Sequence, residues 1–251
     1  MPELSFMPPI SKLLQSNVYR LMALNLIVFL IIEGFFYKTY TGLELHFWKN
    51  PEFEVWQLFS NMFLHSGVSH LALNMFALWS FGRILEQVWG KNRFLLFYLF
   101  CGVSASVVHE IVTHIQYQAL FDQLLSAGLS SEKLEGVLRT GHDISRNYLG
   151  VSKEMLGRFY YLYHTPTVGA SGAIYGLLVA FALIFPNFKV MLIFLPVPVA
   201  AKYFVPVLLL IDLSAGITGF SIFGENIAHF AHIGGAISGA LLVLYWKRKS
   251  S

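Results

Sequence analysis

The segment TVGASGAIYG, residues 167–176, places a serine among small residues at the start of an apolar run. Gly172 follows Ser171 directly, and Gly176 lies four residues further on, so the two glycines share one face of a helix. Small residues at this spacing let two membrane helices approach closely. A serine at a helix N-terminus also lies beside free backbone N–H groups, which stabilise a developing oxyanion. The segment alone therefore allows two interpretations, helix packing and a nucleophile.

Composition indicates that lipid surrounds most of the chain. Of 251 residues, 56% are hydrophobic and 12% are charged, whereas a soluble domain has about 25% charged residues. The net charge of +3 is small and spread out, so we expect no nucleic-acid partner. The first twenty residues lack the pattern of a signal peptide. We therefore expect membrane insertion to depend on the spanning helices themselves.

Hydropathy predicts six membrane-spanning helices in a single domain over residues 1–251. Each span approaches the ~20 residues that cross ~30 Å of hydrocarbon. Six spans place both termini on one side, and the Lys and Arg residues of the short connections predict that this side is cytoplasmic. These features favour a multi-pass protein of a bacterial plasma membrane. The predicted spans are 21–37, 70–85, 94–112, 171–185, 203–220 and 227–246.

Residues 113–166 are more polar than the predicted spans and interrupt them. SSEKLEGVLRTG predicts an amphipathic helix with Ser131 as N-cap and Gly141 as its stop. SKEMLGRFYYLYH predicts a second amphipathic helix with Ser152 as N-cap. The fold class expected is thus an all-α membrane protein with an extramembrane helical insertion between the third and fourth spans.

A serine nucleophile needs a base, and the sixth predicted span contains His229 and His232 in NIAHFAHIGGAISGALLV. An ionisable residue inside a span is a functional candidate, although a histidine that bonds a neighbouring helix is the alternative. Gly235 and Gly239 give this span its own face for close approach. If the glycine faces of spans four and six meet, Ser171 and His232 come within hydrogen-bonding distance.

Further polar residues gather at the outer ends of the same spans. His70 and Asn74 lie four residues apart on one helix face, where they are either an interhelical clamp or donors to an oxyanion. His65 lies in the preceding loop and could brace His70. Tyr175 follows Ser171 by one helical turn, so its ring either packs on the His232 imidazole or is an ordinary packed tyrosine.

The two acidic residues noted inside the predicted spans suggest no Ser-His-Asp triad. Asp212 lies halfway along the fifth span and Glu33 lies in the first, and both are interpreted as interhelical or structural residues. The chemistry expected is therefore a two-residue Ser–His machine without a cofactor. An alternative is a metal or haem site built on histidines, with His65, His70, His229 and His232 as ligands.

Three motifs, HLALNMFALWSFG, GASGAIYG and AHIGGAISG, resemble the signatures of the rhomboid intramembrane serine proteases. The resemblance covers the chain apart from 113–166 and includes the order of the motifs. It implies that Ser171 is the nucleophile and His232 the general base. It further implies that His70 and Asn74 support the oxyanion and that Tyr175 stacks on the base.

The same resemblance implies structural roles outside the site. Trp56 matches the start of a partly immersed first loop, and Gly82 and Glu86 match a structural G-x-x-x-E motif. His229 falls outside the motif and receives no catalytic role.

The resemblance implies a six-helix rhomboid bundle that cleaves single-span membrane proteins within the lipid bilayer. An inactive relative that binds membrane segments without cutting them is the alternative from another functional class. The insertion at 113–166 departs from the compact members of the family, and its role stays open between shaping substrate entry, binding a partner and lying at the interface.

Overall fold

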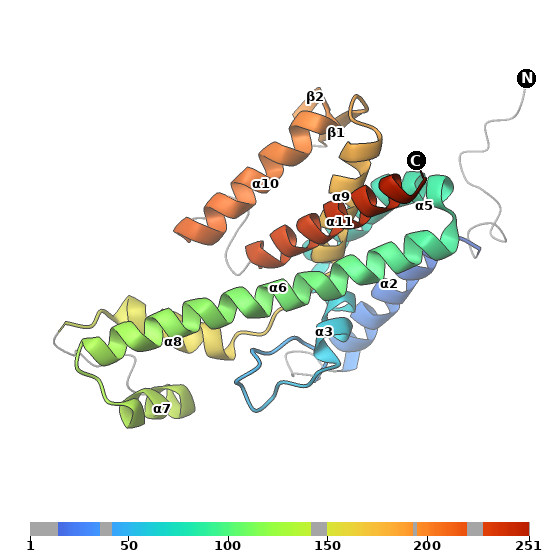
Figure 1. Cartoon of the computed structure of the whole chain (residues 1–251). Helices are drawn as coiled ribbons and strands as arrows, with labels where there is room; N and C mark the ends of the chain where they lie inside the picture. The colour runs from blue at the N-terminus through green and yellow to red at the C-terminus, as the bar shows by residue number, and fades with distance from the viewer. Residues whose placement is uncertain (1–14, 36–41, 142–149, 193–194, 220–227, 251) are drawn as a thin grey trace, which may run out of the picture.

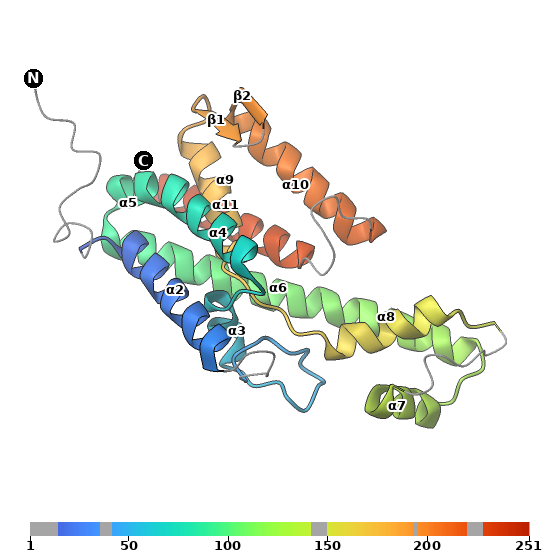
Figure 2. The same ribbon diagram turned by 180° about the vertical axis from the view of Figure 1, so that it is seen from behind.

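The structure is a computed structural model that describes residues 15–35, 42–141, 150–192, 195–219 and 228–250. It is mostly helical, and one long helix, α6, runs through the bundle and beyond it (Figures 1 and 2). The helical elements are α2 (Asn17–Phe35), α3 (Gln57–Ser60), the 3-10 turn η1 (Asn61–Phe63), α4 (Val68–Ala77), the π-helical turn η2 (Leu78–Gly82), α5 (Arg83–Trp89), α6 (Lys91–Ser126), α7 (Ser131–Thr140), α8 (Lys153–His164), α9 (Ser171–Ile184), α10 (Ala201–Thr218) and α11 (His229–Ser250).

Four described helices are long and apolar enough to cross a membrane, namely α2, α6, α10 and α11. The predicted fourth span corresponds to α9, which is apolar but has only 14 residues. The predicted second span corresponds to the run α4–η2–α5, where a π-helical turn interrupts the α-helix. The count of six spans therefore stays a prediction, and residues 36–37, 220 and 227 of the predicted spans lie outside the described residues.

The third predicted span lies within a longer helix, because α6 continues as one helix from Lys91 to Ser126. The end of the span near Val112 stays a prediction. Tyr117, Leu120 and Leu124 continue its buried face beyond Val112, and no glycine or proline occurs between Val112 and Gly128, which has a φ of 93°. Most polar residues after Val112 lie on the other faces of this helix, so hydropathy falls there although the helix continues.

The insertion forms two helices where the sequence predicted them, around a small apolar core of its own. Its buried side chains include Tyr117 and Leu124 of α6, Leu134 of α7 and Phe159 of α8. Figures 1 and 2 show α7 and α8 gathered at the far end of α6. The insertion is therefore packed on α6 rather than tethered to it by loops.

The caps of the insertion helices match the prediction in two of three positions. Ser152 caps α8, since its Oγ accepts the Met155 N–H at 3.2 Å. Gly141 ends α7 in the left-handed conformation. The predicted N-cap Ser131 is wrong by one residue, because Ser130 has the extended backbone and accepts the Lys133 N–H at 3.3 Å.

A β-hairpin departs from the expected all-α fold. Strands β1 (Lys189–Leu192) and β2 (Leu195–Ala200) pair antiparallel, with Lys189 opposite Ala200 and Val190 opposite Val199. Alternating valines favour strands, and the prolines of the second strand fit a two-stranded sheet with open edges. The hairpin connects α9 to α10.

Glu86 joins two helices at the opposite end of the bundle from the insertion. It accepts the Asn17 N–H at 2.6 Å and the Ser16 hydroxyl, so a carboxylate from α5 caps the first turn of α2. Gly82 lies one turn earlier, and a Cβ there would meet Val18 at 3.2 Å. Trp56, by contrast, is 53% exposed and donates its indole N–H to the Gly42 carbonyl at 3.2 Å.

Candidate active site

Helices α9 and α11 are in direct backbone contact, which sets the geometry of the site. A Cβ added to Gly235 would lie 1.9 Å from the carbonyl oxygen of Gly172. A Cβ added to Gly239 would lie 2.7 Å from the Cα of Gly176. Any side chain at Gly235 or Gly239 would thus push the helices apart, and the four glycines lie where the two helices cross.

This contact brings Ser171 and His232 together. Ser171 is the first residue of α9, and its Oγ lies 2.8 Å from Nε2 of His232. His232 is 8% exposed. The backbone before the serine requires a glycine, because Gly169 has a φ of 132°. A serine hydroxyl at this distance from a histidine nitrogen is the contact that activates a serine nucleophile.

Asp212 of α10 lies behind His232, and the expectation that no carboxylate would join the pair is wrong. Its Oδ1 lies 3.2 Å from Nδ1 of His232 and 2.5 Å from Nδ1 of His229, and the residue is 1% exposed. The interpretation of Asp212 as an interhelical residue is confirmed, since it links α10 to α11. The carboxylate also favours the tautomer of His232 in which Nδ1 carries the proton and Nε2 faces the serine.

Tyr175 completes this group from α9. Its ring lies parallel to the His232 imidazole, with centroids 4.2 Å apart and an interplanar angle of 8°. Its hydroxyl donates to Oδ2 of Asp212. One side chain therefore holds the histidine ring by stacking and the carboxylate by a hydrogen bond.

Two features of the sequence could have indicated that Asp212 contacts the histidines. An ionisable side chain within an apolar span needs a partner, and His229 was left without a role. His229 lies on the same helix as His232, one turn away. The structure satisfies the aspartate and both histidines with the same set of hydrogen bonds.

His70 lies on the other side of Ser171. A Cβ built on Gly169 would be 2.9 Å from Nε2 of His70 and 3.6 Å from Oγ of Ser171, so both side chains border the same point. Nδ1 of His70 lies 3.0 Å from the Ser66 hydroxyl. This contact leaves Nε2 of His70 facing the serine.

Asn74 and His65 lie next to His70 but make different contacts. Asn74 is buried and donates its amide N–H to the carbonyl of His70 at 3.1 Å. The rings of His65 and His70 lie 5.0 Å apart. Burial and, to a smaller extent, the neighbouring His70 lower the pKa of His65 to about 4. His65 is therefore neutral at pH 7.

The histidines do not assemble as one metal or haem site within the described part of the chain. Asp212, His229 and His232 are the described residues whose potential ligand atoms lie within 4.8 Å of one another. This set of one carboxylate and two imidazoles is of a kind that zinc accepts. His65 and His70 lie outside that group.

Comparison with known proteins adds a family to this geometry. A family model described as "Rhomboid domain" matches residues 52–137 and 147–249, which is more than half of the chain. The rhomboid protease GluP of Bacillus subtilis is 36% identical over 94 residues, covering 36% of this chain and 18% of that protein.

Two relatives match over longer stretches. The human presenilin-associated rhomboid-like protein, mitochondrial, is 26% identical over 212 residues, covering 81% of this chain and 43% of its own length. Rhomboid protein 1, mitochondrial, of Saccharomyces cerevisiae is 24% identical over 230 residues, covering 91% of this chain and 52% of its own length. The match thus covers about half the length of these two relatives. It covers 18% of the length of GluP. With its apolar helices and this match, the chain is a multi-pass membrane protein that belongs to the rhomboid family.

Proposed function

We propose that this protein is an intramembrane serine endopeptidase that cleaves transmembrane segments of single-span membrane proteins. Membership of the rhomboid family supports a hydrolase. The single observation that carries the finer assignment is the 2.8 Å contact between Ser171 Oγ and His232 Nε2. The position of Ser171 at the N-terminus of α9 adds backbone N–H donors for an oxyanion.

The reaction begins with attack by Ser171 on the scissile carbonyl carbon. His232 Nε2 takes the hydroxyl proton as the Oγ–C bond forms, and the carbonyl oxygen becomes an oxyanion. The imidazolium then returns the proton to the amide nitrogen, the C–N bond breaks and the new amine leaves. Water, deprotonated by the same nitrogen, releases the acyl group and regenerates Ser171.

Asp212 and Tyr175 prepare His232 for both proton transfers. The carboxylate stabilises the positive charge that the imidazole acquires, at 3.2 Å from its Nδ1. The stacked Tyr175 ring fixes the plane of the imidazole. The catalytic unit proposed is therefore the Ser171–His232 dyad. Asp212 is a positioning residue that acts through His232.

Oxyanion stabilisation comes from the Ser171 N–H and from His70, whose Nε2 borders the same space as the serine hydroxyl. Asn74 is the second proposed side-chain donor. Its amide donates one N–H to the carbonyl of His70 on its own helix, and the second N–H is the donor proposed for the oxyanion.

A substrate helix must unwind before this chemistry can begin. A regular helix keeps its carbonyl groups in hydrogen bonds, so cleavage needs a locally extended segment in the lipid-facing substrate. We place both termini of the protein on the cytoplasmic side by the distribution of Lys and Arg. The named relatives come from a bacterium and from mitochondria, and a bacterial plasma membrane stays the prediction for this chain.

Labelling by a fluorophosphonate probe tests the proposal without a known substrate. The detergent-purified protein is expected to react, and Ser171→Ala and His232→Ala are expected to abolish the reaction. Ser126→Ala is a matched control, because Ser126 is an exposed serine that bonds only its own helix. A folded protein that does not react at all would refute the proposal and favour a relative that binds membrane segments without cutting them.

A further inference from the structure

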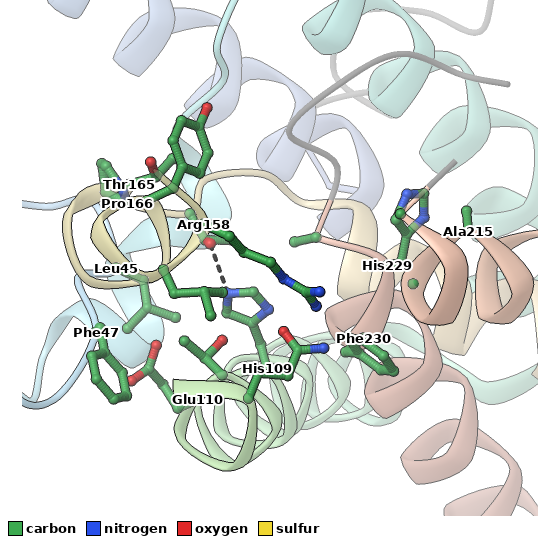
Figure 3. A pocket seen from close by; sticks show the side chains of 18 of the residues that line it. Leu45, Phe47, His109, Glu110, Arg158, Thr165, Pro166, Ala215, His229 and Phe230 are labelled. Atoms are coloured by element: carbon green, nitrogen blue, oxygen red, sulfur yellow. Dashed lines mark hydrogen bonds between the residues drawn. The ribbon is translucent and has the colours of Figure 1, made fainter. Parts of the chain in front are cut away.

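A cavity of about 1000 Å³ opens between the insertion and the helices that carry Asp212 and His232. Its walls come from α6, α8, the last turns of α10 and the first turn of α11 (Figure 3). His109 and Glu110 belong to α6, Arg158 and Tyr161 to α8, and Phe230 to α11. The insertion thus forms one wall of a cavity whose other walls come from α6, α10, α11 and the loop segments around Leu45 and Pro166.

This cavity lies beside a small pocket at the nucleophile. Ser171 lines the small pocket, and four residues line both spaces: Leu45, His109, Thr167 and Ala228. His109 lies at the junction, with Nε2 2.9 Å from the Thr167 hydroxyl. Its buried Nδ1 has no hydrogen-bond partner among the described residues. A substrate segment next to a carbonyl at Ser171 therefore lies close to the cavity, and His109 stands between the two spaces.

One charge of the lining is open to a ligand. Glu110 accepts the backbone N–H of Trp48 at 2.8 Å, and the carboxylate of Glu154 bonds Ser152 and its own backbone N–H. Arg158 is exposed, and no hydrogen bond or ion pair joins it to the described residues. Figure 3 shows its side chain extending across the cavity toward Phe230.

The rest of the lining suits an extended polypeptide. Apolar side chains stand beside polar groups, among them Leu45, Phe47, Leu162, Pro166, Thr113 and Gln116. An unwound segment exposes backbone N–H and C=O groups that need partners outside water. A membrane-spanning helix would present only apolar side chains and would leave these polar groups unused.

We infer that the cavity binds an extended extramembrane segment of the substrate beside the scissile bond, and that Arg158 contacts an acidic side chain of that segment. The planar guanidinium matches a carboxylate in a two-bond arrangement. The inference rests on the proposed proteolytic function and gives the insertion a role in substrate selection. It assigns the preference for an acidic substrate segment to Arg158 of α8 rather than to the residues around Ser171.

Charge reversal tests the inference with two reporters. Both are the same single-span membrane protein, and the segment flanking its cleaved bond carries either aspartates or lysines. The intact enzyme should cut the aspartate reporter faster, and Arg158→Glu should reverse the preference by roughly three- to tenfold. Arg139→Glu is the matched control, since Arg139 is an exposed arginine of α7 that does not line the cavity.

Two further measurements separate failure of this inference from failure of the proposed function. Fluorophosphonate labelling of Ser171 should be equal in the intact enzyme and in Arg158→Glu, because the probe does not fill the cavity. In a Ser171→Ala background, a photoreactive benzoylphenylalanine at Tyr161 should crosslink the aspartate reporter, whereas the same group at Glu135 of α7 should not.

Equal preferences in Arg158→Glu and Arg139→Glu, or crosslinking at Tyr161 to lipid but not to the reporter, would overturn the inference. Loss of labelling in the intact protein would instead count against the proposed function. The crosslinking result stands in either case, because capture of a bound reporter needs no hydrolysis.

Discussion

Replacing Gly235 by alanine tests whether the contact between α9 and α11 positions the reactive pair. The new methyl group would lie 1.9 Å from the carbonyl oxygen of Gly172, where ordinary contact begins at 3.4 Å. The clash is with backbone, so no side-chain rotation relieves it. The two helices must therefore separate by about 1.5 Å at this point.

The expected effect on the site follows from one distance. The contact between Ser171 Oγ and His232 Nε2 is 2.8 Å, and His232 lies one turn before Gly235 on the same helix. A separation of about 1.5 Å would break that hydrogen bond, and misplacement by roughly 1 Å costs about 100-fold in rate. Overpacking of this kind also destabilises a protein by about 1–3 kcal/mol.

The assay is the rate of fluorophosphonate labelling, measured beside thermal unfolding in the same detergent. Gly136→Ala serves as the control, because this helical glycine of α7 has no atom within 4 Å of an added Cβ. We expect labelling to fall about 100-fold in Gly235→Ala and to stay unchanged in Gly136→Ala. Wild-type labelling and unfolding temperature in Gly235→Ala would refute the reasoning that this contact sets the site.

Three other predictions concern groups with known contacts. Asp212→Asn should slow labelling roughly 10²- to 10⁴-fold while leaving the protein folded, because the amide supports the wrong His232 tautomer; unchanged labelling beside the control Asp122→Asn would remove Asp212 from the mechanism. Glu86→Gln should lower the unfolding temperature by a few degrees, since the carboxylate that accepts the Asn17 N–H at 2.6 Å loses its charge; an equal temperature would show that shape alone suffices. Burial lowers the pKa of His65 to about 4, whereas in the unfolded protein it has the ordinary histidine pKa of about 6.5. Between these two pH values, His65 therefore binds fewer protons in the folded protein than in the unfolded protein. Stability should therefore fall as pH drops through that window, by up to about 3 kcal/mol, and His65→Asn should flatten this slope in urea unfolding; an unchanged slope would assign it to other groups.

Sequence patterns were sufficient to predict which helix faces meet. Gly172, Gly176, Gly235 and Gly239 lie at helical spacing, and close approach depends on the absence of side chains, which a sequence states directly. The same argument brought Ser171 and His232 to one end of their helices. Their chemical roles stay predictions, because geometry alone does not measure reactivity.

Other features depend on information that local patterns do not carry. Asp212 reaches His232 only because α10 is rotated to face α9 and α11, and helix rotation follows from packing rather than from composition. The continuation of α6 beyond the predicted span was missed, because its buried face there packs against α7 and α8, which a local hydropathy pattern does not show. The N-cap of α7 shifted by one residue because two adjacent serines, Ser130 and Ser131, are equally good caps by type.

The length of the short helix α9 fixes the depth of Ser171 in the membrane. Its 14 residues span about 21 Å, whereas the hydrocarbon layer is about 30 Å thick. Lys247 bonds the carbonyl of Leu183 at 2.9 Å near the other end of α9, and a lysine ammonium stays close to the membrane surface. If the Lys247 end of α9 lies at one membrane surface, Ser171 at the other end of the helix lies roughly 9 Å below the opposite surface, the difference between about 30 Å and about 21 Å. The length of α9 would then determine the depth at which a substrate is cut. One residue added to α9 would shift the cleaved bond along the membrane normal by about 1.5 Å.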